Sequence, residues 1–276
     1  MLPRLTLGQY LPGDSPIHRL DARTKILVTL AYMAALLFAR GPLALGACAA
    51  FTAGWLATAR LPPAALWRGN RGIIVLVLLT VVLDVLLGPP TTAAAASQSG
   101  WHVGPFLVTQ TGVATGLAAG LRLGLLVAQS TLVTATTAPL DLVAGTETLL
   151  GPFRRVGVPA HDLALMTGLA LRFIPTLAEE AQRIALAQAA RGADLQSPGR
   201  ARLRAIVAML VPLLLSVLRR AEQLALAMEA RGYRGAEGRS RWRQPRLGRL
   251  DAVAGAAGVA LVLAVTLASL MRHPGL

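Results

Sequence analysis

The apolar residues of this chain gather into five long runs and do not alternate with polar residues. The runs cover residues 26–39, 43–59, 73–87, 112–135 and 252–271. A helix needs roughly 17–25 mostly apolar residues to span the hydrocarbon core of a bilayer, and each run approaches that length once its flanks are counted. The pattern therefore predicts an all-α, polytopic membrane protein with about five transmembrane helices.

The pattern changes between the fourth and fifth runs. Apolar stretches there are short, at 163–171 and 205–218, and Arg172, Pro175 and Pro212 interrupt them. Stretches of about 10–14 apolar residues favour interfacial helices over independent spans. We therefore expect three parts, which are the N-terminal segment with the first four spans, a block of long amphipathic helices at the membrane surface, and the last span. Their ranges are 1–136, 137–248 and 249–276.

The arginines are distributed unevenly around these helices. Arg60, Arg68 and Arg71 lie between the second and third runs, and a larger cluster lies between residues 191 and 249. The loop 88–111 contains no Lys or Arg. Because positively charged loops stay in the cytoplasm, we expect the N-terminus and the 137–248 block to be cytoplasmic and the 88–111 loop to face outward.

The fourth run carries glycines at every fourth position. Gly112, Gly116, Gly120 and Gly124 therefore share one helical face, which lets another helix approach closely. The spacing indicates a packing surface, and its partner is either another helix of this chain or a second subunit.

Composition agrees with a membrane protein that has a basic cytoplasmic surface. The chain has 276 residues, is 54% hydrophobic and carries a formal charge of +14, a combination that basic soluble proteins seldom show. Aromatic residues make up only 4% and no base-reading motif accompanies the arginines, so we expect no nucleic-acid partner. Cys48, the single cysteine, and four scattered histidines show no metal-ligand spacing, so we expect no metal site in this chain.

Two segments of the predicted cytoplasmic block end in the same three residues. The segment "IALAQAARGADL" reaches Ala190-Arg191-Gly192, and "LALAMEARGYRG" reaches Ala230-Arg231-Gly232 with an offset of forty residues. One copy indicates only a helix end, since Gly accepts the left-handed conformation and Arg suits the negative end of the helix dipole. Two copies favour a binding role as well, because two equivalent arginine side chains match a partner with two similar grooves, such as a dimer of ATPases.

The chain lacks the phosphate-binding loop of ATPases. That motif requires Gly-Lys-Ser/Thr, whereas Lys25 is the only lysine and follows Thr24. Any ATP chemistry must therefore come from another polypeptide.

Three longer segments resemble a known family. Residues 8–27, "GQYLPGDSPIHRLDARTKIL", 169–195, "LALRFIPTLAEEAQRIALAQAARGADL", and 219–235, "RRAEQLALAMEARGYRG", are similar to the T component of energy-coupling factor transporters. The resemblance implies a non-catalytic membrane scaffold that joins two ATPase subunits to a small substrate-binding membrane subunit, the S component. Such complexes import a vitamin or a transition-metal ion across the cell membrane of a bacterium or archaeon. ATP and Mg²⁺ are then bound by the ATPases, this chain needs no cofactor, and substrate specificity belongs to the S component.

The resemblance also implies roles for particular residues. In that family the paired motifs end coupling helices: the arginines enter grooves on the two ATPases, the alanines keep the contact narrow and the glycines turn the chain away. The matching positions here are Ala190, Arg191, Gly192, Ala230, Arg231 and Gly232. The apolar stretches of the coupling helices are expected to face the S component, with Pro175, Met209, Leu210, Pro212 and Leu214 as candidates.

Other charged residues leave alternatives open. Asp84 and Arg122 lie inside predicted spans, where charges are unfavourable and often functional. They either pair with each other, or Asp84 reaches the nearby membrane interface. Asp21, Arg23 and Lys25 form either a juxtamembrane anchor or a docking site for the coupling helices.

Two other functions compete with this interpretation. A secondary transporter that works alone would place its site at broken helices near the bilayer midplane, usually between internal repeats, whereas the repeat here lies at charged helix ends. A membrane-bound enzyme would need a nucleophile, an acid–base pair or a set of metal ligands, and no such group stands out. A requirement for ATP separates the coupling subunit from the secondary transporter.

Overall fold

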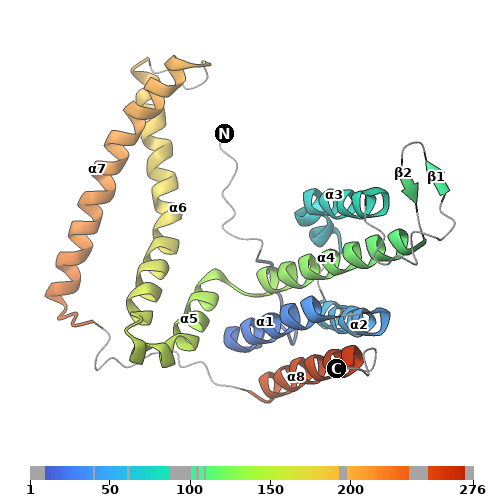
Figure 1. Cartoon of the computed structure of the whole chain (residues 1–276). Coiled ribbons are helices and arrows are strands. Elements are labelled where there is room, and N and C mark those ends of the chain that lie inside the picture. The colour runs from blue at the N-terminus through green and yellow to red at the C-terminus, as the bar shows by residue number, and fades with distance from the viewer. Residues whose placement is uncertain are drawn as a thin grey trace. The chain divides into compact units, whose positions relative to one another are not determined.

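The computed structural model describes residues 10–39, 41–60, 63–87, 101–103, 106–108, 110–192, 198–235 and 248–270. These residues form two compact units, divided between Gly145 and Thr146 and again between Gln244 and Pro245. We call them the membrane unit, which contains the predicted spans, and the coupling unit, which contains both Ala-Arg-Gly motifs. The predicted all-α fold is confirmed, with one short hairpin of two strands added to it (Figure 1).

The described residues of the membrane unit form five long helices and the hairpin. The helices are α1 (Ala22–Phe38), α2 (Pro42–Ala59), α3 (Pro63–Leu87), α4 (Gln110–Thr136) and α8 (Arg249–Leu270), and the antiparallel strands are β1 (Trp101–Val103) and β2 (Phe106–Val108). Each of the five predicted apolar runs thus falls on a helix. Helix α1 packs against α8, α4 and α2, and α3 packs against α4. The core of the unit includes Tyr32, Leu36, Cys48 and Val265, all almost fully buried.

Three helices in the described part of the chain are long and apolar enough to cross a membrane, judged by length and composition. They are Pro42–Ala59, Gly112–Thr136 and Arg249–Ser269. Helix α1 has 17 residues and is shorter than each of these three stretches. The predictions that α1 and α3 span the membrane stay predictions.

The glycine strip of α4 packs inside the chain. A Cβ added at Gly116 would lie 2.8 Å from Val85 Cγ2 and 3.1 Å from the Val81 carbonyl oxygen, and one added at Gly120 would meet the Val81 side chain. Only a residue without a Cβ lets α3 and α4 approach so closely. Of the two partners left open by the sequence, the structure selects α3 for these two glycines, while nothing lies within 4 Å of a Cβ at Gly124.

The two charges inside the predicted spans do not pair with each other. Arg122 Nη2 donates a hydrogen bond to the carbonyl oxygen of Ala39, 2.8 Å away, at the end of α1. No salt bridge joins Arg122 to Asp84, and both side chains belong to the described residues. The pairing alternative is therefore wrong, because an unpaired helix-end carbonyl takes up the guanidinium.

The coupling unit is built around two long helices. Helix α5 (Pro139–Leu149) crosses from the membrane unit into the coupling unit, and a 3₁₀ helix η1 (Gly151–Val156) leads to α6 (Ala160–Ala190) and then to α7 (Arg200–Ala230). Helices α6 and α7 have 31 residues each and pack against each other. Pro175 and Pro212 lie inside them, so each helix continues through its proline.

Candidate functional site

Helix α6 ends at the first Ala-Arg-Gly motif. Ala190 is its last helical residue, and Arg191 is the C-cap with φ −89° and ψ 9°. Gly192 has φ +87°, in the left-handed region, and its N–H donates to the Ala189 carbonyl at 3.0 Å. The glycine is required because this turn needs a conformation that residues with a Cβ rarely adopt.

Helix α7 ends in the same way at the second motif. Arg231 is the C-cap with φ −87° and ψ 7°, and Gly232 has φ +70°. The Gly232 N–H donates to the Glu229 carbonyl at 2.8 Å, and the Tyr233 N–H donates to the Met228 carbonyl at 3.0 Å. These two bonds define a Schellman motif, which satisfies the last carbonyls of the helix.

The arginines of the two motifs have no structural role inside the described chain. Arg191 and Arg231 are exposed, and neither guanidinium forms a hydrogen bond or an ion pair with another residue that the structure describes. The neighbouring alanines, Ala190 and Ala230, are exposed as well. Turn geometry therefore accounts for the glycines of both motifs, whereas the two arginine forks stay available to a partner.

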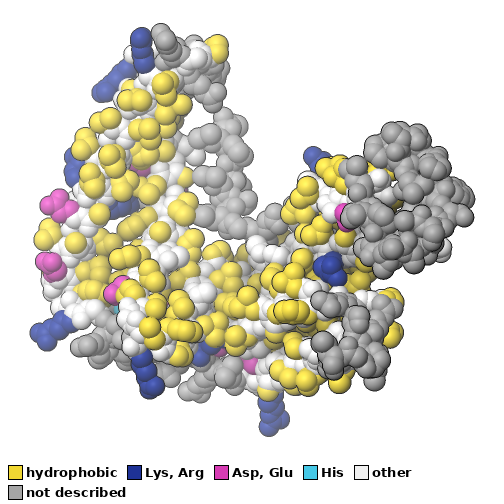
Figure 2. Space-filling model, in the orientation of Figure 1, with side chains coloured by type: hydrophobic (Ala, Val, Ile, Leu, Met, Phe, Trp, Pro, Cys, Tyr) yellow, Lys and Arg dark blue, Asp and Glu magenta, His cyan; other side chains and the backbone are white. Residues whose placement is uncertain are grey.

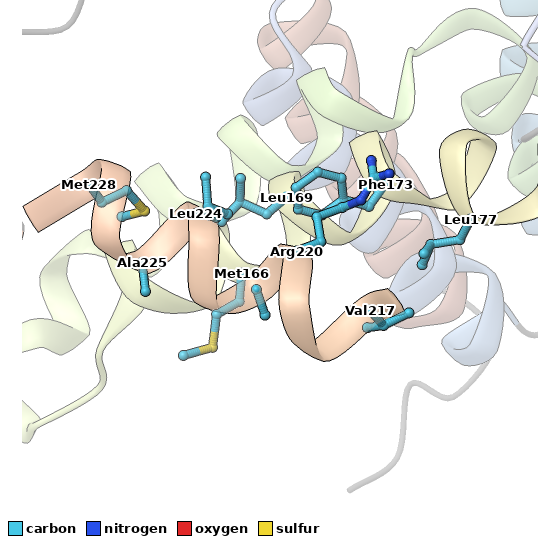
Figure 3. A pocket seen from close by; sticks show the side chains of 10 residues that line it. Met166, Leu169, Phe173, Leu177, Val217, Arg220, Leu224, Ala225 and Met228 are labelled. Atoms are coloured by element: carbon cyan, nitrogen blue, oxygen red, sulfur yellow. The ribbon is translucent and has the colours of Figure 1, made fainter. Parts of the chain in front are cut away.

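Helices α6 and α7 run antiparallel. The Arg220 guanidinium of α7 lies over the Phe173 ring of α6, 6.0 Å from its centroid. Around this contact an apolar groove of about 340 Å³ opens between the first half of α6 and the second half of α7 (Figure 3). Since the early part of one helix faces the late part of the other, the two motifs lie at opposite ends of the pair.

The separation of the motifs follows from this contact. Arg191 lies 18 residues beyond Phe173, and Arg231 lies 11 residues beyond Arg220 in the opposite direction. A helix rises about 1.5 Å per residue, so the two arginines are about 40 Å apart along the pair.

The second helix of the pair carries an exposed apolar stripe. Its members lie at positions i, i+4, i+7, i+8, i+11, i+12 and i+15 and are each at least half exposed: Leu203, Val207, Leu210, Val211, Leu214, Leu215 and Leu218. Hydrophobic side chains cover much of the visible surface of α6 and α7 in Figure 2. Exposed apolar surface of this extent is typical of a docking or membrane-contact face.

The candidate S-component residues lie on or beside this stripe. Leu210 and Leu214 belong to it, at 50% and 60% exposure, and Met209 and Pro212 on the same helix are partly exposed. Pro175 is exposed on α6. Their contact with an S component stays a prediction.

Lys25 is a buried residue whose role the sequence pattern missed. It is 1% exposed, and its Nζ donates hydrogen bonds to the Thr136 carbonyl at 2.9 Å and to Thr137 Oγ1 at 3.2 Å. Lys25 precedes the apolar run of α1, and burial lowers its pKa to about 8, against the opposing effect of nearby carboxylates. The juxtamembrane anchor is therefore wrong for Lys25, which instead ties the start of α1 to the end of α4.

Two carboxylates organise the same end of the membrane unit. Asp21 caps α1, since its Oδ1 accepts the Arg23 N–H at 3.0 Å. The Asp21 N–H donates to Asp251 Oδ1 at 2.8 Å, and Asp251 Oδ2 accepts the Gly248 N–H at 2.8 Å. Asp251 thus joins the first turn of α8 to the first turn of α1.

The described histidines are held by local contacts. His18 bonds Ser15 Oγ at 2.6 Å and the Leu11 carbonyl at 3.0 Å, and His161 bonds Glu147 at 3.0 Å. The His102 side chain and His273 lie outside the described residues. Among the residues that the structure does describe, no three His, Cys, Asp or Glu side chains gather as metal ligands.

Comparison with known proteins gives one consistent family. The model of the cobalt transport protein family CbiQ matches residues 13–242. The energy-coupling factor transporter transmembrane protein EcfT of Acidaminococcus fermentans is 46% identical over 262 residues, which is 95% of each chain. The EcfT proteins of Heliobacterium modesticaldum and Bacillus subtilis are 43% and 40% identical over 88% of this chain and 89% and 90% of their own lengths. The chain therefore belongs to the CbiQ family of membrane transport proteins and is a transmembrane T component of an energy-coupling factor transporter.

Proposed function

We propose that this T component is the non-catalytic coupling subunit of an ATP-driven micronutrient importer. It joins two cytoplasmic ATPase subunits to a substrate-binding S component and transmits ATPase closure to that component, for uptake of a vitamin or a transition-metal ion. The observation that carries the proposal is the pair of matched helix ends, each with an exposed arginine whose guanidinium has no partner among the described residues.

The geometry of the two ends fits a dimeric partner. Two antiparallel helices of equal length that end in the same turn are related by an approximate two-fold rotation at their ends. A dimer of ATPases also has two-fold symmetry, so it offers each motif the same groove in the same orientation. Arg191 and Arg231 each bond carboxylates or carbonyls in one groove, the alanines keep the contact narrow, and the glycines turn the chain away.

The apolar stripe of α7 supports the second contact. A large exposed apolar face on an amphipathic helix is stable only against lipid or another apolar surface. In this proposal the stripe, with Leu210 and Leu214 at its centre and Met209, Pro212 and Pro175 beside it, faces the S component at the cytoplasmic surface of the membrane. The N-terminus and the coupling unit lie in the cytoplasm of the bacterial or archaeal cell.

The nucleotide belongs to the partners in this proposal. ATP and Mg²⁺ are bound by the two ATPases. The only lysine of this chain is buried against Thr136 and Thr137, outside any phosphate-binding motif.

The test is coexpression of the chain with ATPase and S subunits from a related bacterium. Wild type, Arg191→Ala, Arg231→Ala and the double variant are compared for copurification of the ATPases and for ATP-dependent uptake. Arg183→Ala on α6 and Arg204→Ala on α7 are matched controls, since both arginines are exposed and neither lies at a motif.

The expected result is weaker ATPase binding in each single motif variant, loss of the complex in the double variant, and normal binding in both controls. Equal assembly and equal uptake in all variants would refute docking through the arginines. Uptake without ATP or ATPases would instead favour a secondary transporter.

A further inference from the structure

Helix α5 is the described connection between the two units. Its residues up to Gly145 belong to the membrane unit, and those from Thr146 belong to the coupling unit. Among the described residues, this helix is therefore the route by which a movement of the coupling unit reaches the membrane unit. How firmly the first half of α5 is held decides whether that movement is transmitted or absorbed.

Both ends of the segment that enters α5 are held by one turn of α1. At the start, Lys25 Nζ binds the Thr136 carbonyl and Thr137 Oγ1. At the end, Gly145 packs on Ala22: a Cβ added at Gly145 would lie 3.0 Å from Ala22 Cβ and 3.3 Å from the Ala22 carbonyl carbon. Because backbone meets backbone here, the contact has little freedom to adjust.

The same turn of α1 is fixed to the rest of the membrane unit. Asp251 of α8 accepts the Asp21 N–H at 2.8 Å, directly before α1. Ala22, Lys25, Asp251 and Thr137 are all buried. The start of α1 therefore holds α4, α5 and α8 together, and we call this cluster of Asp21, Ala22, Lys25, Thr136, Thr137, Gly145 and Asp251 the α1 junction.

We propose that Lys25 and Gly145 are positioning residues for energy coupling, which hold α5 as the fixed end of the lever formed by the coupling helices. The proposal rests on the proposed coupling function. A rigid-body tilt of the coupling helices does work on the membrane unit only if one end of the connection stays attached. Loosening the α1 junction leaves ATPase docking at Arg191 and Arg231 intact but lets α5 absorb the movement.

The first test measures uptake per ATP hydrolysed in the full complex, reconstituted in lipid vesicles. Lys25→Met removes the donor at similar length, and Gly145→Ala places a Cβ against Ala22. The double variant Ala22→Gly/Gly145→Ala moves the methyl group to the other side of the contact. Gly255→Ala in α8 is the matched control, because nothing lies within 4 Å of its added Cβ.

Lys25→Met and Gly145→Ala are expected to copurify with the ATPases and hydrolyse ATP, while uptake per ATP falls by about fivefold or more. The Ala22→Gly/Gly145→Ala exchange removes the 3.0 Å contact but keeps the 3.3 Å contact with the backbone, so it restores uptake in part, and Gly255→Ala matches wild type. A variant that only destabilised the protein would lower assembly and uptake together. Unchanged uptake per ATP in both single variants would overturn the proposal, whereas failure of the wild-type chain to bind ATPases would overturn the proposed function itself.

A second test uses the unique lysine as a probe in the wild-type complex. An amine-reactive reagent followed by mass spectrometry of this chain's peptides reports the exposure of Lys25, since this chain has no other lysine side chain. Labelling of Lys25 is expected to stay slow in the nucleotide-free, ATP-bound and vanadate-trapped complexes. Fast labelling in any of these states would show that the junction opens during the cycle and would contradict a fixed end.

Discussion

Replacing Gly232 with Ala separates the turn of an Ala-Arg-Gly motif from the chemistry of its arginine. Gly232 has φ +70°, and nothing lies within 4 Å of an added Cβ, so the change meets no neighbouring atom. The remaining effect is conformational, because an L-residue in the left-handed region costs about 1–2 kcal/mol. If the docking proposal holds, the turn that aims Arg231 becomes less populated and ATPase affinity falls by about 5- to 30-fold.

Two further variants of this helix end test the turn and the arginine separately. Gly232→Asn is expected to bind better than Gly232→Ala, since Asn tolerates the left-handed conformation. Arg231→Ala keeps the turn but loses charged hydrogen bonds worth about 1.5–3 kcal/mol, which lowers affinity by about 10- to 150-fold. The assay is the Kd for the ATPase pair, measured with the purified chain in lipid nanodiscs. Wild-type affinity in Gly232→Ala, or weaker binding by Asn than by Ala, would refute the reasoning.

Two predictions concern the membrane unit itself. Gly116→Ala places a Cβ against Val85 and is expected to lower stability by about 1–3 kcal/mol, whereas Gly124→Ala has open space and is expected to be neutral or stabilising; thermal unfolding in detergent compares the two. Lys25 has a pKa of about 8 when folded and 10.5 as its ordinary value. Below pH 8 the lysine is charged in both the folded and the unfolded state, so burial of the ammonium lowers the free energy of unfolding by its full amount. Stability should therefore rise between pH 8 and 10.5, by about 3 kcal/mol in total, and Lys25→Met should remove this rise. An equal rise in Lys25→Met would assign it to other groups.

The helices and their ends were predictable because they depend on local sequence. The apolar runs predicted α1 to α4 and α8, and the repeated Ala-Arg-Gly sequence predicted the ends of α6 and α7. Both signals are local in the sequence. The length of an apolar run predicts a helix of similar length, and a glycine after an alanine-rich segment predicts the turn that ends a helix.

The partners of particular residues were not predictable, since they depend on segments far along the chain. Lys25 follows Asp21 and Arg23 and precedes an apolar run, so its neighbours indicate an interfacial charge. Its burial comes from Thr136 and Thr137, more than a hundred residues away. Arg122 likewise meets the carbonyl of Ala39 and not Asp84, because the end of a helix in another part of the chain offers a free acceptor.

The two coupling helices are alike at their ends and different in their middles. Their C-caps share φ and ψ within a few degrees, yet Pro175 lies 16 residues before Arg191 and Pro212 lies 19 residues before Arg231. A proline removes one helical hydrogen bond and favours bending at its position. The two helices are therefore weakened at different distances from their C-terminal arginines. In the proposed function, equal ends suit two equivalent ATPases, and unequal middles suit a single S component, which has no second copy to match. Moving Pro212 to position 215, in a Pro212→Leu/Leu215→Pro variant that restores the spacing of α6, tests this division of roles. It should preserve ATPase binding and impair S-component binding, and the reverse result would contradict the assignment.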